Sequence, residues 1–197
     1  MKKKTMPIIL ALIFVIGGSV GLYNYLSNRT ERPELLVVPE ESTEQTENPD
    51  SEPPEQEKTK APSFAVQDAT GNAVDLSDML GKPIVLNFWA SWCPPCKEEM
   101  PDFNKVFEEL GEDVHFMMVD AVDGVRETKE KGEAYVTEQG FSFPVYYDIG
   151  QEAVMQYGIR AFPTTIFIDS EGYIVTGAEG AIDEKTLRRG IDLIVSE

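Results

Sequence analysis

A chain of 197 residues is long enough for one domain with appendages, and its formal net charge of −18 reflects 35 acidic and 17 basic residues. The acidic excess is concentrated in residues 61–197, which hold 25 acidic and 10 basic side chains. Such a negative surface argues against binding to nucleic acid or to an anionic membrane.

Residues 1–28 have the features of a membrane anchor. Lysines at positions 2–4 precede a charge-free stretch from Thr5 to Asn28. As a helix, residues 7–26 would span about 30 Å, the thickness of a bilayer core, and the lysines would stay in the cytoplasm. A cleaved signal peptide is the alternative, because residues 17–21 are small, whereas a lipoprotein signal would need a cysteine directly after the apolar segment. The apolar run continues to Leu26, which favours a retained single-pass anchor with the rest of the chain outside the cytoplasm.

Residues 29–60 are predicted to be a disordered linker. Eight acidic residues and no Lys or Arg lie between Glu40 and Glu57, and prolines stand at positions 39, 49, 53 and 54. A polar, self-repelling chain of this kind cannot build a core. We therefore expect a tether between the anchor, 1–28, and a folded domain, 61–197.

The folded domain shows alternating strand and helix patterns. A hairpin is predicted at 64–68 and 73–75, and Ser77 is expected to cap a short helical turn through Leu80. This order of elements predicts an α/β fold, a central mixed sheet flanked by helices. The further strands are expected at 84–89, 113–119, 141–148, 164–169 and 173–178, and the helices after Cys93 to about Leu110, after Thr128 to about Gln139, at 151–157, and from a cap at Asp183 to about Ser196.

Two cysteines, Cys93 and Cys96, lie where the strand 84–89 is followed by a helix. Pro94 and Pro95 suit a first helical turn, where the missing N–H groups would have no intrahelical partner. The positive end of the helix favours a thiolate, so Cys93 is expected to be an exposed nucleophile, and Cys96 can close a disulfide with it. A disulfide with a purely structural role would stabilise the fold little, because so short a loop removes little chain entropy from the unfolded state. A zinc site is also disfavoured, since the chain holds two cysteines and one histidine where zinc wants four ligands.

The acidity of the pair is expected to be moderate. Neither intervening proline can donate an N–H, so only Cys96 and residues beyond it can support a Cys93 thiolate. Nearby acidic residues, Glu98 and Asp102 among them, disfavour the thiolate further. A thiolate that is only moderately stabilised indicates a reductant rather than a strong oxidant.

Around these cysteines, residues 87–101, from Asn87 to Pro101, resemble the TlpA/ResA-like branch of the thioredoxin superfamily, whose members are membrane-anchored thiol–disulfide oxidoreductases. The resemblance continues over about 61–197. It implies a thioredoxin-like fold with an N-terminal β-hairpin and the helix–strand insertion of that branch, and a redox-active Cys93–Cys96 disulfide. It also implies residues that support the pair or bind substrate: Trp92, Pro94, Pro95, Phe162 and Pro163.

Two residues take specific roles from this resemblance. Glu99 matches a glutamate that helps to handle protons, here the proton of Cys96. Pro163 matches a cis-proline that would hold the backbone of Phe162 beside Cys93, as a short edge for an extended substrate.

The resemblance further implies that Cys93 attacks a partner disulfide and that Cys96 resolves the mixed disulfide. The family mostly reduces its targets, with apocytochrome c during cytochrome c maturation a frequent client and an exported methionine sulfoxide reductase another plausible one. The resemblance implies that a membrane electron carrier reduces the Cys93–Cys96 disulfide again, and it implies no cofactor.

Two other function classes share related folds. Peroxiredoxins place a Pro and a Thr or Ser before the reactive cysteine, at positions that are Leu86 and Ala90 here. Copper chaperones normally need a CxxxC spacing and a distal histidine, and the spacing here is CxxC. Both patterns fail in this sequence, so the thiol peroxidase and the copper chaperone are kept only as alternatives to the disulfide reductase.

Overall fold

The computed structural model of the protein describes residues 36–37 and 58–196. The predicted anchor, 1–28, and most of the predicted linker lie outside the described residues. Within the described ranges, no helix has both the length and the apolar character needed to cross a membrane.

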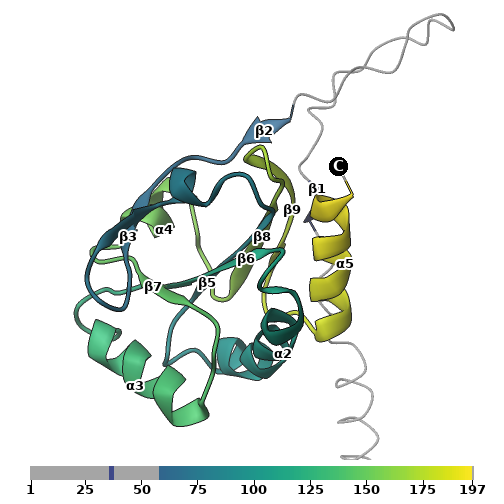
Figure 1. The fold of residues 1–197 in the computed structure, drawn as a ribbon. Coiled ribbons are helices and arrows are strands. Elements are labelled where there is room, and N and C mark those ends of the chain that lie inside the picture. The colour runs from purple at the N-terminus through teal and green to yellow at the C-terminus, as the bar shows by residue number, and fades with distance from the viewer. Residues whose placement is uncertain (1–35, 38–57, 197) are drawn as a thin grey trace, which may run out of the picture. The chain divides into compact units, whose positions relative to one another are not determined.

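A single mixed sheet forms the centre of the fold (Figure 1). Its nine strands within the described residues follow the order β1-β9-β8-β5-β6-β7-β3-β4, and β2 also pairs with β9. Strands β5, β6 and β7 are parallel to one another, and the other pairs are antiparallel. The strands are β1 Leu36–Val37, β2 Thr59–Lys60, β3 Ala65–Gln67, β4 Ala73–Asp75, β5 Ile84–Trp89, β6 His115–Asp120, β7 Val145–Tyr147, β8 Thr164–Ile168 and β9 Tyr173–Glu179.

Strand β5 is the most deeply buried part of the sheet. All six of its residues are buried, since it pairs with β6 on one side and β8 on the other while helices cover both faces. Its apolar, β-branched and aromatic side chains suit this position. Helix α2, Pro94–Leu110, starts five residues after Trp89 ends this strand, so the rigid centre of the domain positions the cysteines.

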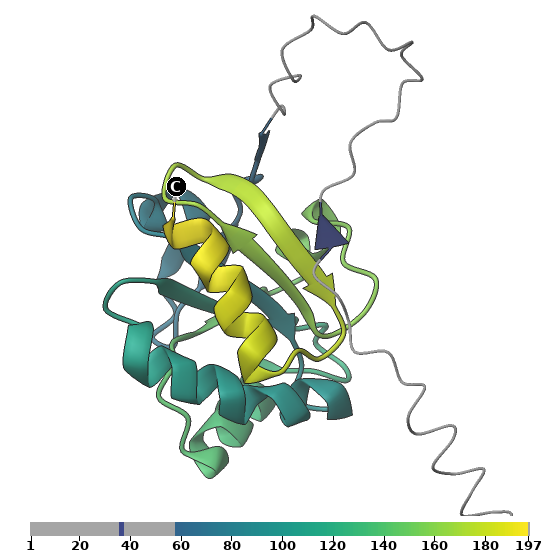
Figure 2. The same ribbon diagram turned by 90° about the vertical axis from the view of Figure 1, so that its right-hand side faces the viewer.

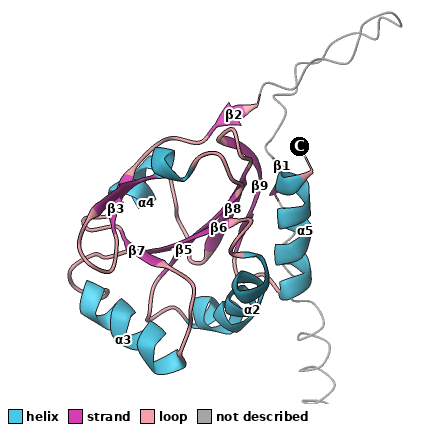
Figure 3. Ribbon diagram, viewed as in Figure 1, coloured by secondary structure: helices cyan, strands magenta, loops and turns pink. Residues whose placement is uncertain are grey.

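The helices divide between the two faces of the sheet (Figures 2 and 3). On one face, α2, α3 and α5 cover a core that includes Trp89, Phe103 and Phe167, and Figure 2 shows α5 across β8 and β9. On the other face, α4 and η1 cover a core that includes Phe64 and Phe88. The helices are η1 Leu76–Met79, α2 Pro94–Leu110, α3 Lys129–Gln139, α4 Glu152–Gln156 and α5 Glu184–Val195.

Local signals fix several helix ends as the sequence predicts. Asp183 caps α5, its side chain accepting the Thr186 N–H at 3.0 Å. Gly140 ends α3 with φ 71°, a left-handed conformation that favours glycine. The α3–β7 unit is the helix–strand insertion that the resemblance implies, and the β3–β4 pair is the predicted hairpin.

The structure corrects two predictions. The helical turn η1 is capped by Asp75 and not by Ser77, because the Asp75 carboxylate accepts the Ser77 N–H and Asp78 accepts the Asp75 N–H in return. The segment 29–60 is not wholly without structure, because β1 and β2 lie within it and both pair with β9. An open sheet edge offers unpaired N–H and C=O groups, and short apolar or polar segments can pair with it whatever their own propensity.

Candidate active site

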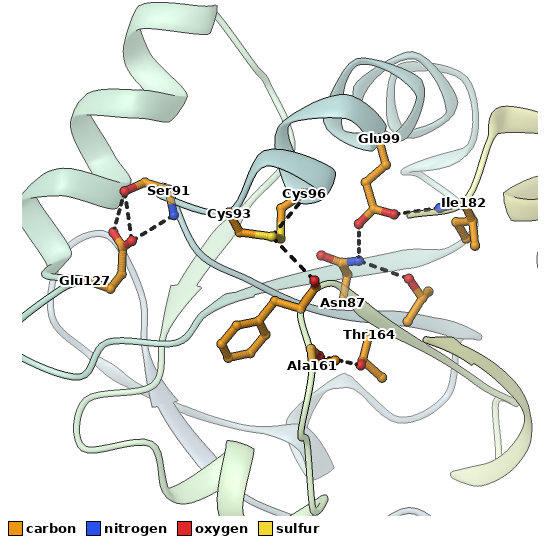
Figure 4. Close-up of a disulfide and its surroundings, with 11 residues drawn as sticks. Asn87, Ser91, Cys93, Cys96, Glu99, Glu127, Ala161, Thr164 and Ile182 are labelled. Atoms are coloured by element: carbon orange, nitrogen blue, oxygen red, sulfur yellow. Dashed lines mark hydrogen bonds between the residues drawn. A yellow bond between two sulfur atoms is a disulfide. The ribbon is translucent and has the colours of Figure 1, made fainter. Parts of the chain in front are cut away.

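Cys93 and Cys96 form a disulfide at the start of α2, with 5.3 Å between their Cα atoms (Figure 4). Cys93 is the N-cap residue, and its sulfur accepts the Cys96 N–H at 3.3 Å. The structure thus confirms that Pro94 and Pro95 fill the first helical turn and that Cys96 is the first residue able to donate an N–H to Cys93. The sulfur that would carry a negative charge lies at the positive end of the helix.

The expectation that Cys93 is exposed is wrong for the disulfide form. Cys93 is only 2% exposed and Cys96 is fully buried, while Pro94 and Pro95 are exposed. As an N-cap, Cys93 turns its side chain back over the helix end, where the carbonyl oxygen of Phe162 lies 3.5 Å from its sulfur. A partner must therefore approach across the turn that contains Phe162.

That turn has the conformation implied by the resemblance. The Phe162–Pro163 peptide bond is cis. The Thr164 hydroxyl donates to the Ala161 carbonyl at 2.9 Å, and the Gly180 N–H donates to the Pro163 carbonyl at 2.8 Å. The Phe162 ring contacts the Trp92 ring edge to face, at 6.1 Å between centroids. Trp92 and Phe162 are both half-buried and lie beside the disulfide.

Glu99 lies three residues after Cys96 on the buried side of α2. It is 2% exposed, and its two carboxyl oxygens accept one hydrogen bond each, from Asn87 Nδ2 at 2.9 Å and from the Ile182 N–H at 3.0 Å. Burial raises the pKa of Glu99 to about 8; these two hydrogen bonds oppose the rise and the Asp102 charge adds to it. Glu99 can therefore gain and lose a proton near neutral pH.

Asn87 connects Glu99 to the sheet. It is fully buried in β5, and its Nδ2 group donates to Glu99 and also to Thr165 Oγ1 at 3.0 Å. Because an amide does not titrate at ordinary pH, the proton chemistry beneath the disulfide belongs to the carboxyl group of Glu99.

A second buried glutamate, Glu127, holds the loop just before the cysteines. Its carboxylate accepts the Ser91 N–H at 2.8 Å and the Ser91 hydroxyl at 2.8 Å. In Figure 4 this pair and Glu99 lie on opposite sides of the disulfide. Sequence reasoning missed Ser91 and Glu127, because they are 36 residues apart and no periodic pattern connects them.

Asp120 is a further buried carboxyl group, and sequence reasoning missed it as well. It ends β6, level with Trp89 in the neighbouring strand, and neither of its carboxyl oxygens has a hydrogen-bond partner in the described part of the chain. Burial raises the pKa of Asp120 to about 9, and the charges of Glu127 and Asp123 add to the rise. The backbone of α3 passes directly over it, since a Cβ atom on Gly132 would lie 2.0 Å from Asp120 Oδ2.

A disulfide at a helix N-terminus, beside a cis-proline turn and on the same helix as a buried acid, is suited to thiol–disulfide exchange. The fold and this site together define a thioredoxin-like redox protein. Across residues 58–196, no group of three or more His, Cys, Asp or Glu side chains is arranged to hold a metal ion.

Comparisons with known proteins agree with this class. The model of the AhpC/TSA family matches residues 58–176. The thiol–disulfide oxidoreductase ResA of Bacillus thuringiensis (strain Al Hakam) is 30% identical over 187 residues, which cover 94% of this chain and 92% of that protein. ResA of Halalkalibacterium halodurans is 35% identical over 139 residues, covering 70% of this chain and 77% of that protein.

A solved structure, described as a putative thiol:disulfide interchange protein DsbE from Chlorobium tepidum, superposes with a TM-score of 0.61 at 28% identity, covering 68% of this chain and 94% of that one. The chain belongs to the AhpC/TSA family and, with the ResA proteins, to the thiol–disulfide oxidoreductases.

Proposed function

We propose that this thiol–disulfide oxidoreductase works outside the cytoplasm on a membrane tether, where it reduces disulfides in exported client proteins. The observation that carries the exchange chemistry is the buried Glu99, with its pKa of about 8, three residues from Cys96 on the same helix. Such a group supplies a base for the second, buried thiol.

The reaction begins with the dithiol form. The Cys93 thiolate attacks one sulfur of the client disulfide, the client S–S bond breaks, and one client thiolate leaves. Cys96 then gives its proton to the Glu99 carboxylate and attacks Cys93, which releases the second client thiolate. The client gains two electrons, its two thiolates take up protons from Glu99 and from water, and the protein is left with the Cys93–Cys96 disulfide.

The environment of Cys93 supports a reductant. Its sulfur receives the Cys96 N–H, while Pro94 and Pro95 have none to give. A thiolate with little support stabilises the reduced form little, so electrons pass readily to a client. The oxidised protein then needs two electrons from a membrane electron carrier.

The tether rests on the apolar segment 7–26 and the three lysines before it. The tethered redox domain would act on exported clients such as an apocytochrome c or a methionine sulfoxide reductase.

The test is covalent trapping in the full-length protein. A Cys96→Ala variant should accumulate mixed disulfides through Cys93 in the membrane fraction, and an impermeant thiol reagent should reach Cys93 from outside the cell. The Cys93→Ala/Cys96→Ala double variant is the matched control and should trap nothing.

Two results would contradict the proposal. One is recovery of the full-length protein in the cytosol. The other is a purified dithiol form that reduces no protein disulfide but turns over peroxide or binds copper, which would favour the peroxidase or the copper chaperone.

A further inference from the structure

The loop Asp123–Glu127, between β6 and α3, is fixed against the active-site loop. Glu127 binds the backbone and hydroxyl of Ser91, two residues before Cys93 (Figure 4). Asp123 Oδ1 accepts the N–H groups of the three residues at 125–127, at 2.7–2.9 Å. Lys131 Nζ donates to the carbonyls of residues 125 and 126. The loop therefore holds one shape beside the cysteines before any partner arrives.

This loop places a cation over the tryptophan that precedes Cys93. The Arg126 guanidinium carbon lies 3.4 Å from the centre of the Trp92 ring. Stacking on an aromatic face leaves the N–H groups in the guanidinium plane free, and these are the groups that bind carboxylates in pairs. Trp92 in turn contacts Phe162, whose carbonyl lies against the Cys93 sulfur.

Arg126 has no carboxylate partner among the described residues, although the domain is strongly acidic. Its side chain is exposed, and no ion pair joins it to residues 58–196. Arg188 shows the contrast, because it pairs with both Glu109 and Glu184. Residues 61–197 hold 25 acidic side chains, and none of those described pairs with Arg126. The guanidinium N–H groups of Arg126 are therefore available to a carboxylate of another molecule.

We propose that Arg126 is a specificity-determining residue, which binds a carboxylate next to the cysteine of the client disulfide. The occupant is an extended client segment with an acidic residue flanking its reactive cysteine. Val125, 84% exposed at the same loop, adds an apolar contact for that segment. This inference rests on the proposed function, because it concerns the choice of client and not the exchange itself.

The test uses three synthetic peptides that each contain one intramolecular disulfide and differ at one residue beside the cysteine: Glu, Gln or Lys. The measured quantity is the ratio of the exchange rate of the Glu peptide to that of the Gln peptide, with reduced protein in excess. Wild type should favour the Glu peptide about three- to tenfold at low salt, and 0.5 M salt should reduce this ratio. Arg126→Gln should bring the ratio to about one, Arg126→Lys should keep part of it, and Arg126→Glu should shift preference to the Lys peptide.

Arg189→Gln is the matched control. It removes one exposed arginine from α5 and changes the net charge by the same amount, so it should keep the wild-type ratio. A ratio that is equal in wild type, Arg126→Gln and Arg126→Glu would overturn this inference alone. Failure of reduced wild type to exchange with any of the three peptides would overturn the proposed function and this inference with it.

Discussion

Glu99, on the helix of Cys96, and Asp120, opposite Trp89 in the sheet, are both buried carboxyl groups, but their oxygens have different surroundings. Glu99 receives hydrogen bonds from Asn87 and from the Ile182 backbone, whereas Asp120 receives none from the described residues and faces the charges of Glu127 and Asp123. Burial raises the pKa of both, to about 8 for Glu99 and about 9 for Asp120, although an aspartate ordinarily has the lower value.

The difference shows how hydrogen bonds turn a buried acid into a usable base. Hydrogen bonds to the charged form oppose the cost of burial and keep the pKa of Glu99 within reach of neutral pH. Asp120 lacks them, and its pKa of about 9 keeps it protonated near neutral pH. Only Glu99 of these two also shares a helix with Cys96, so the group that can move a proton is the one beside the buried thiol.

The largest expected effect is on stability at high pH. Between its unfolded pKa of 3.8 and its folded pKa of about 9, Asp120 binds a proton in the folded protein that the unfolded chain has released. The free energy of unfolding should therefore fall as pH rises through this window, by an amount on the order of several kcal/mol. Urea unfolding of Asp120→Asn at pH 5, 7 and 9 should show a much flatter pH dependence than wild type. An unchanged slope would mean that Asp120 is not the protonated group.

The next effect is on the second chemical step. Glu99→Gln removes the base for Cys96 and should slow release of the client from the mixed disulfide by about 10²-fold. In wild type this rate should rise as pH passes through about 8, because Glu99 then loses its proton, and the variant should lack that rise. Stopped-flow release of a labelled peptide measures both. Asp120→Asn is the matched control and should stay within about threefold of wild type at pH 7.

A third experiment takes a hydrogen bond away from Glu99, so that its carboxyl group comes closer to the unsupported state of Asp120. Asn87→Ala removes one of the two donors to Glu99 and should raise the pKa of Glu99, so the midpoint of the rate profile should move up by about one pH unit. The rate at pH 7 should then fall about tenfold. Thr165→Val is the control. It removes only the other partner of Asn87 and should leave the midpoint in place. A shift of equal size in both variants would indicate a general effect of repacking.

The smallest expected effect concerns the opposite side of the disulfide. Ser91→Ala removes the hydroxyl that donates to Glu127 but keeps the backbone N–H that does the same. The free energy of unfolding should fall by about 1 kcal/mol, the usual size for one hydrogen bond, and urea titration measures it. A loss several times larger would show that the hydroxyl, and not the backbone, holds Glu127.

The sequence predicted those parts of the fold that have local signals. The apolar run of β5, the prolines at the start of α2 and the Asp183 cap are each readable within a few residues, and the structure has all three. The cis bond at Pro163 and the place of Glu99 followed from the resemblance, since nothing local distinguishes them.

What the sequence did not predict depends on contacts between distant segments. Cys93 is covered because Phe162 lies against it, 69 residues along the chain. Asp120 differs from a surface aspartate only because α3 passes over it at Gly132. Strands β1 and β2 form because β9 offers them an edge, and each spans only two residues, too few to show a strand pattern in the sequence.

That pairing of β1 and β2 with β9 also bears on how many copies of the protein can be crowded together without aggregating. Antiparallel partners already cover residues 173–174 and 176–177 of β9, on the side facing away from β8. At the other end of the sheet, β4 spans only three residues. A long, open edge strand is a template on which neighbouring chains can add strands and start fibrils. With one edge covered by its own chain and the other very short, the domain gives neighbouring copies little backbone to pair with.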